Sequence, residues 1–155
     1  MADASTTTVS TADSGLLDTD LIEIVNEVWD AYLQQPATSP AGEQAQWDKR
    51  DYTAAVSITG AWEGHVRVLV PPGPARDITD AMGELINVVG GNIKNRGIQP
   101  AKLGLPLVAT GKMLFPATRE AHRLSVRWHD EDLLTFSVLQ ANPDRAGFTF
   151  IGKPR

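Results

Sequence analysis

The chain has 155 residues, of which 42% are hydrophobic and 21% are charged, and its formal net charge is -5. A single domain of this size buries enough apolar surface to fold without a metal or a disulfide. The lack of cysteine excludes thiolate metal sites, thiol catalysis and a disulfide framework. The negative net charge argues against a nucleic-acid partner, because neutralising phosphates requires clustered Lys and Arg.

The first residues, 1–17, are rich in Ala, Ser, Thr and Asp. They have neither the basic start nor the apolar run of a signal peptide, and no apolar stretch elsewhere approaches the about 20 residues that span a bilayer. The sequence therefore predicts a disordered leader over 1–17, a single domain over 18–155, no membrane insertion and a cytoplasmic location.

The ordered part of the chain is predicted to begin with a helix over 20–35. An acidic first turn at Asp20 favours a helix start, and apolar residues recur at helical spacing until Pro36. The next segment, 36–48, is rich in Pro, Gly, Ser and Gln, so we expect a loop there.

A β-hairpin is predicted next, because two β-rich runs, 52–58 and 65–70, flank a turn with glycines at 60–64. The Pro-rich segment 71–74 should end the second strand.

The main helix is predicted over 78–94, with Asp77 as its N-cap. After it, the runs 105–110 and 112–115 predict one strand or two, broken at Gly111. A second hairpin is predicted from 123–129 and 133–139. Strands that arrive in hairpins with few crossover helices indicate an α+β fold. We expect a mostly antiparallel sheet with two long helices packed on it.

The main helix has one polar and one apolar face. At about 100° per residue, one sector collects two acids, an amide and a glycine, namely Asp80, Glu84, Asn87 and Gly91. Apolar residues fall opposite: Ile78, Met82, Leu85, Val89 and Ile93. Spacing alone also fits ordinary solvated residues, because Glu23 and Asn26 repeat the Glu-x-x-Asn pattern in the first helix.

Two adjacent glycines separate the second copy of this pattern from the first. Inside a helix, Gly90 and Gly91 each cost about 1 kcal/mol relative to alanine, so a reason is expected. Either they end the helix early or something packs closely against its backbone, and the sequence leaves both open.

With these residues in view, the chain resembles the CheX branch of the CheC/CheX/FliY family of chemotaxis phosphatases. The resemblance rests on Asp80, Glu84, Asn87 and Gly91-Asn92, followed by Leu105-Pro106 and Gly111. It is closer to CheX because the chain has one full motif, whereas CheC-like members usually carry two. The resemblance implies a CheX-like domain over 18–155, with Gly91 and Asn92 as a structural motif.

The resemblance also implies an enzyme that hydrolyses the aspartyl phosphate of a CheY-like response regulator. Asn87 would position the attacking water, since an uncharged amide both donates to and accepts from a water. Glu84 would dock the lysine of the regulator's active site. The regulator would bring its own Mg²⁺, so this chain is expected to bind no cofactor or metal. A CheX-like homodimer is expected, favoured by unpaired strand edges.

A module of the same fold that binds or scaffolds a response regulator without hydrolysis is the alternative. Intact Glu84 and Asn87 favour the phosphatase. The three histidines lack metal-ligand spacing, so each is interpreted as a surface or strand residue rather than a ligand. The four tryptophans are not interleaved with basic residues, so they are interpreted as structural, in the core or in hairpin packing.

Overall fold

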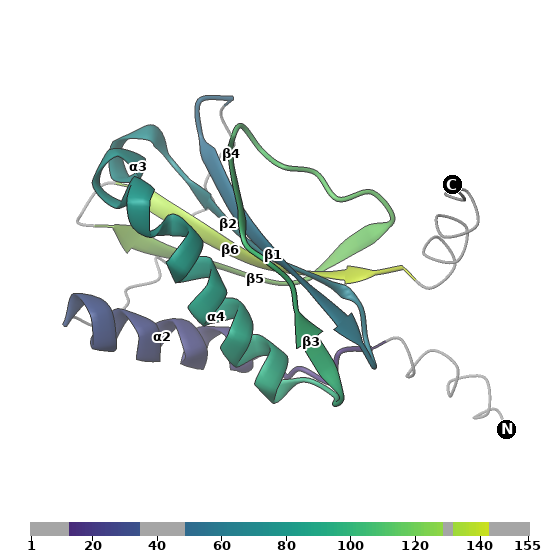
Figure 1. Cartoon of the computed structure of the whole chain (residues 1–155). Coiled ribbons are helices and arrows are strands. Elements are labelled where there is room, and N and C mark those ends of the chain that lie inside the picture. Colours follow the sequence, from purple (N-terminus) through teal and green to yellow (C-terminus); the bar gives the residue numbers. More distant parts are fainter. Residues whose placement is uncertain (1–12, 35–48, 129–131, 143–155) are drawn as a thin grey trace, which may run out of the picture.

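The structure is a computed structural model that describes residues 13–34, 49–128 and 132–142. Within these ranges six strands form one sheet, and every strand pair is antiparallel. In the same ranges, three α-helices accompany the sheet (Figure 1). The α+β class and the antiparallel sheet predicted from the hairpins are therefore confirmed.

The sheet has the strand order β3-β1-β2-β6-β5, and β4 also pairs with β1. The strands are β1 (Tyr52–Gly60), β2 (Gly64–Val70), β3 (Ala101–Leu103), β4 (Leu107–Thr110), β5 (Thr118–Trp128) and β6 (Asp132–Ala141). Ile58 of β1 pairs with β3 and Tyr52 of β1 pairs with β4, so these two short strands follow one another along one edge of the sheet.

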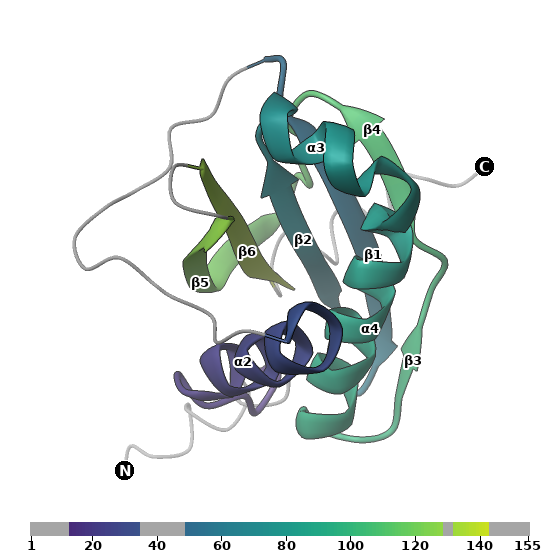
Figure 2. The same cartoon turned by 90° about the vertical axis from the view of Figure 1, so that its left-hand side faces the viewer.

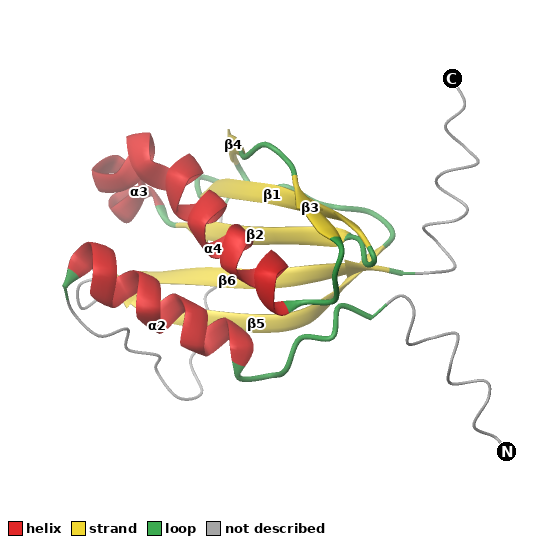
Figure 3. Cartoon of the chain, turned by 60° about the horizontal axis from the view of Figure 1, so that its bottom comes forward, coloured by secondary structure: helices red, strands yellow, loops and turns green. Residues whose placement is uncertain are grey.

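Two long helices, α2 (Asp20–Leu33) and α4 (Met82–Arg96), lie side by side on the same face of the sheet (Figures 2 and 3). A short helix, α3 (Pro72–Ile78), and a 3-10 turn, η1 (Thr79–Ala81), lead into α4 and were not predicted. No helix in the described ranges is both long and apolar enough to cross a membrane.

The core lies between the sheet and these two helices. Successive side chains of a strand point to opposite faces, so alternate residues of the central strands meet the helices. The buried residues on the strands include Val56, Val66, Val68, Phe136 and Val138, and those on the helices include Ile24, Val25, Ile86, Val89 and Ile93. The structural interpretation of the tryptophans is confirmed for Trp29 and Trp62, which are both buried. Trp47 lies outside the described residues.

The start of the main helix was predicted wrongly. Asp77 lies inside α3 and does not cap α4, whose N-cap position is Ala81 without a side-chain capping bond. The prolines that follow β2 end that strand as predicted, but they also begin α3, since proline is well tolerated in the first turn of a helix. Asp80 consequently lies in η1 rather than in α4.

Strand boundaries also differ from the sequence prediction. The run 112–115 is not a strand, whereas β3 was not predicted at all. Gly111 has a φ of 84°, a left-handed conformation that suits glycine, and it marks the turn where β4 has ended. Pairing with β1, rather than the local residue pattern, defines the short strands β3 and β4.

Of the two explanations for the paired glycines, close packing holds for Gly90. Helix α4 continues through both glycines to Arg96. A Cβ atom on Gly90 would overlap Cγ1 of Val56 on β1. A Cβ atom on Gly91 would instead lie 3.8 Å from Cδ2 of Leu103, an ordinary contact. Packing within this chain therefore requires glycine at position 90 but not at position 91.

The described chain begins at Asp13, five residues before the expected domain boundary. Ser14 is buried, its N–H donates to Oε1 of Gln140 (3.3 Å), and its carbonyl accepts from the N–H of Ile98 (2.8 Å). Residues 13–17, which the sequence analysis assigned to the leader, thus include contacts with the domain. The rest of the expected leader lies outside the described residues, as do 35–48 and 143–155.

Candidate functional site

Glu84 and Asn87 lie on the solvent-facing side of α4, and both side chains are exposed. Because they are three residues apart on one helix, they are neighbours on its surface. The opposite side of α4 is buried, with Met82, Ile86 and Val89 fully enclosed by the core. The sequence analysis placed Leu85 on the buried side and overlooked Ile86, whereas Leu85 is only partly buried.

The two side chains have no hydrogen-bond or ion-pair partner among the described residues. Asn92 differs, since its Nδ2 donates to the carbonyl of Val88 on the same helix (2.9 Å). The amide of Asn87 and the carboxylate of Glu84 are therefore available to a water or to a partner protein. Asp80 is also exposed, in the turn that precedes α4.

On α2, the glutamate of the similar pair, Glu23, has a structural role instead. Nη1 of Arg96 donates to Oε1 of Glu23 (2.6 Å) and to Oδ1 of Asp20 (3.0 Å), and Nη2 lies 3.6 Å from Oε2 of Glu27. Arg96 is the last residue of α4, so these bonds join the two long helices. Glu23 is thus held in place by a cation, unlike Glu84. The sequence analysis did not identify Arg96.

The pKa shifts of Asp20 and Arg96 agree with these ion pairs between the two helices. The backbone N–H of Leu17 and the guanidinium of Arg96 hold the pKa of the Asp20 carboxyl below its ordinary value, against the opposing effect of partial burial. The hydrogen bonds to Glu23 and Asp20 raise the pKa of Arg96. The charges of Asp20 and Glu23 are consequently paired inside the molecule.

An apolar strip flanks the polar face of α4 on the side of β3 and β4. Its residues are Leu105 and Val108, and Leu105 is 85% exposed. The strip is next to the helix, because a Cβ atom on Gly83 would lie 3.8 Å from Cγ2 of Val108. Contiguous exposed apolar residues beside a polar site are typical of protein interaction surfaces.

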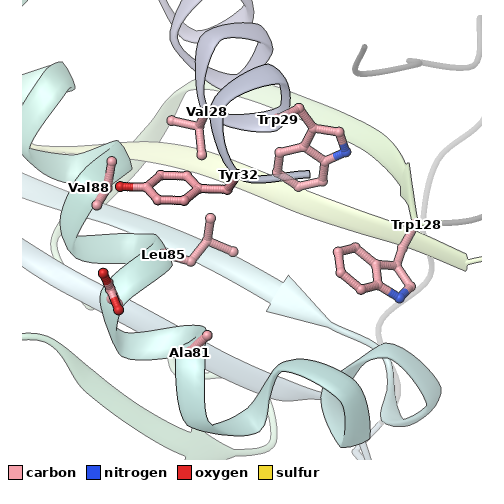
Figure 4. A pocket seen from close by; sticks show the side chains of 8 residues that line it. Val28, Trp29, Tyr32, Ala81, Leu85, Val88 and Trp128 are labelled. Atoms are coloured by element: carbon pink, nitrogen blue, oxygen red, sulfur yellow. The ribbon is translucent and has the colours of Figure 1, made fainter. Parts of the chain in front are cut away.

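A pocket of about 250 Å³ lies on the other side of Glu84, between α2, α4 and the end of β5 (Figure 4). The lining residues are Val28, Trp29, Tyr32, Ala81, Glu84, Leu85, Val88 and Trp128. This pocket was not predicted from the sequence. Helical spacing places Trp29 and Tyr32 on one side of α2, but only the packing of α2 beside α4 brings them next to Glu84.

In the described part of the chain, no three His, Asp or Glu side chains gather in a way that could hold a metal ion. The ring of His65 stacks on Phe115 with centroids 3.9 Å apart, and burial lowers the pKa of this histidine. Nδ1 of His122 lies 3.4 Å from Oδ1 of Asp18. These two histidines therefore have packing and pairing roles.

No protein-family model matches this sequence, and a comparison with curated proteins gives no match either. Solved structures do match. The chain is similar to the chemotaxis protein CheX from Vibrio vulnificus, with a TM-score of 0.57 and 14% identity, over 78% of this chain and 94% of that one. It is equally similar to the chemotaxis protein CheX from Desulfovibrio desulfuricans, with a TM-score of 0.57 and 15% identity, over 79% and 97%.

A third match is a chain of the CheX-CheY-BeF3-Mg²⁺ complex from Borrelia burgdorferi, with a TM-score of 0.57 and 11% identity. The similarity covers 79% of this chain and 96% of that one. Each comparison spans most of both chains, although the sequence identities are low. The protein described here therefore has a CheX-like fold.

Proposed function

We propose that this protein is a phosphatase that hydrolyses the aspartyl phosphate of a CheY-like response regulator. A shared fold does not establish a shared activity, so the proposal rests on the site. The observation that carries it is the pair of Glu84 and Asn87, which are exposed, adjacent on α4 and without partners among the described residues.

This reaction requires few catalytic groups from the chain itself. The regulator supplies the phosphoryl group and its own Mg²⁺, and an in-line attack by water needs chiefly a correctly placed water. The amide of Asn87 accepts one hydrogen bond from this water and donates another, without a charge that would repel the phosphoryl oxygens. The water oxygen bonds to phosphorus as the bond to the aspartyl oxygen breaks, which yields a free aspartate and dihydrogen phosphate that carries both hydrogens of the water.

Glu84 has the docking role in this proposal. Its exposed carboxylate accepts hydrogen bonds from the lysine of the regulator's active site, and this contact orients the helix so that Asn87 faces the phosphoryl group. The apolar strip of Leu105 and Val108 adds contact area on one flank.

Gly91 also belongs to the docking face. It lies one turn beyond Asn87 on α4, and packing inside this chain does not require a glycine there. A residue without a side chain lets the backbone of a partner approach closely. We therefore assign Gly91 to the approach of the regulator, and Asn92 to support of the helix through its bond to the carbonyl of Val88.

A second function, binding of a regulator without hydrolysis, is favoured by the apolar strip taken alone. Binding of this kind uses the same surface but does not depend on the amide of Asn87. We also propose a homodimer, because one side of β4 pairs with β1 and its other side has no strand neighbour among the described residues.

The decay of acyl phosphate on receiver domains, timed with and without this protein, tests the activity. Asn87→Ala is expected to lower the accelerated rate by about 10²-fold or more, the usual effect of losing one group that stabilises a transition state. The fold should be unaffected, because an exposed side chain leaves no cavity when it is truncated.

Asn26→Ala is the matched control, since Asn26 is also an exposed asparagine on a long helix. It should retain the full rate. An Asn87→Ala protein that stays fully active would rule out the mechanism. A wild-type protein that binds receivers without accelerating decay would support the scaffold function.

A further inference from the structure

The pocket beside Glu84 has the size of a side-chain site. Its volume of about 250 Å³ is smaller than the about 300–1,000 Å³ of most small-molecule sites. Trp29 and Tyr32 of α2, Leu85 and Val88 of α4, and Trp128 of β5 form apolar walls (Figure 4). A pocket with these walls suits one long side chain from another protein.

The walls of the pocket are held by the core. Trp29 is only 2% exposed and packs edge-on against Phe136, with centroids 5.9 Å apart, and against Trp128, with centroids 6.5 Å apart. Tyr32 is 58% exposed. The pocket therefore combines a fixed aromatic wall with an accessible aromatic ring, and little ordering is required on binding.

The single carboxylate of the pocket favours a positively charged occupant. Among the described residues that line it, Glu84 alone carries a formal charge, and that carboxylate is exposed. Long basic side chains bury their methylene stems along apolar surface while the cationic end stays near water. Aromatic rings also attract cations. An apolar aromatic pocket with one carboxylate is thus complementary to lysine or arginine.

We propose that this pocket binds a second basic side chain of the response regulator, next to the active-site lysine that Glu84 docks. The stem of this side chain packs between Tyr32 and Leu85, and its cationic end shares the Glu84 carboxylate, whose two oxygens accept several hydrogen bonds. The inference rests on the proposed function and extends it, because the pocket then determines which regulators bind productively.

A pair of small probes tests the chemistry of the pocket without any phosphatase assay. Pentylammonium and 1-pentanol have the same stem and differ in charge. Their binding is followed through the indole N–H signals of Trp29 and Trp128 in nuclear magnetic resonance spectra, with the buried Trp62 as an internal reference. We expect both pocket signals to shift, with pentylammonium bound about two- to fivefold more tightly than pentanol.

Glu84→Gln should reduce this preference for the cation, leaving only the part due to the aromatic rings, while pentanol still binds. Equal affinities for the two probes in the wild-type protein would overturn the proposal. So would the absence of any shift of the two pocket signals.

A filling variant tests the role of the pocket with the regulator. Ala81 is exposed and lines the pocket, so Ala81→Leu should occupy it and raise KM for the phosphorylated regulator by about fivefold or more, with a smaller effect on kcat. Ala31→Leu is the matched control, because Ala31 is exposed on α2 and does not line the pocket.

An unchanged KM for Ala81→Leu would overturn the proposal. An unchanged KM together with a lower melting temperature would also overturn it, because that result would mean that part of this chain already occupies the pocket. That failure is distinct from failure of the proposed function, which is measured by the loss of accelerated decay in Asn87→Ala.

Discussion

Alanine at the two adjacent glycines of α4 should have opposite effects on stability. Both positions lie inside the helix, so each substitution gains about 1 kcal/mol of helix propensity. At Gly90 the new methyl group meets Cγ1 of Val56, which is 1% exposed. Valine has a stiff χ1 angle and its buried methyl group cannot easily turn aside. At Gly91 the methyl group makes only an ordinary contact.

The size of the difference follows from these contacts. Overpacking a core typically costs about 1–3 kcal/mol, so Gly90→Ala should be about 0–2 kcal/mol less stable than wild type once the helix gain is included. Gly91→Ala should be up to about 1 kcal/mol more stable. The two variants then differ by about 1–3 kcal/mol, which corresponds to about 2–4 °C in melting temperature for each kcal/mol.

Urea unfolding followed by circular dichroism measures both free energies, with the midpoints compared at an unchanged m-value. The background variant Val56→Ala removes the methyl group that Gly90→Ala would overlap. Adding Gly90→Ala to that background should no longer destabilise the protein, a coupling that a double-mutant cycle detects. If Gly90→Ala proves as stable as Gly91→Ala in the native background, close packing is not the reason for the glycine.

Three further predictions concern other parts of the molecule. Removal of residues 1–17 should lower the unfolding midpoint relative to removal of 1–12, because only the longer deletion removes the bonds of Ser14; equal midpoints would contradict this. Burial lowers the pKa of His65, so the unfolded chain binds more protons, and stability should fall as pH drops below about 6.5 toward the lowered pKa. His65→Phe should flatten that slope in urea midpoints measured against pH, and an unchanged slope would count against the argument. Light scattering should give twice the chain mass, and Leu107→Lys on the exposed edge of β4 should reduce it; a monomeric wild-type mass at tens of micromolar would exclude the dimer.

The two Glu-x-x-Asn copies differ in whether the glutamate has a partner within the chain. Both copies lie on long amphipathic helices, and Asn26 and Asn87 are both exposed. Glu23 is paired with Arg96, whereas Glu84 has no partner among the described residues and lines a pocket. A carboxylate already paired with an arginine is less available to a partner's cation. The structure thus gives a physical reason for choosing α4, where the sequence had only the glycines that follow Asn87.

The α+β class, both hairpins and the polar face of α4 were predictable from the sequence, because they depend on residue spacing within one element. Alternation along β1 and β2 and helical periodicity along α4 are local patterns, and a short turn after Gly60 separates β1 from β2.

Other features were decided only by tertiary contacts. Gly90 is required because Val56 of β1 packs against it. Glu23 forms an ion pair because Arg96, at the end of α4, reaches α2. Trp29 lines a pocket because α4 lies beside α2. Residue spacing within α4 could not reveal any of these, since each depends on a partner from a distant part of the chain. The packing of helices and strands against one another therefore determined which of the sequence's candidate residues are free to act.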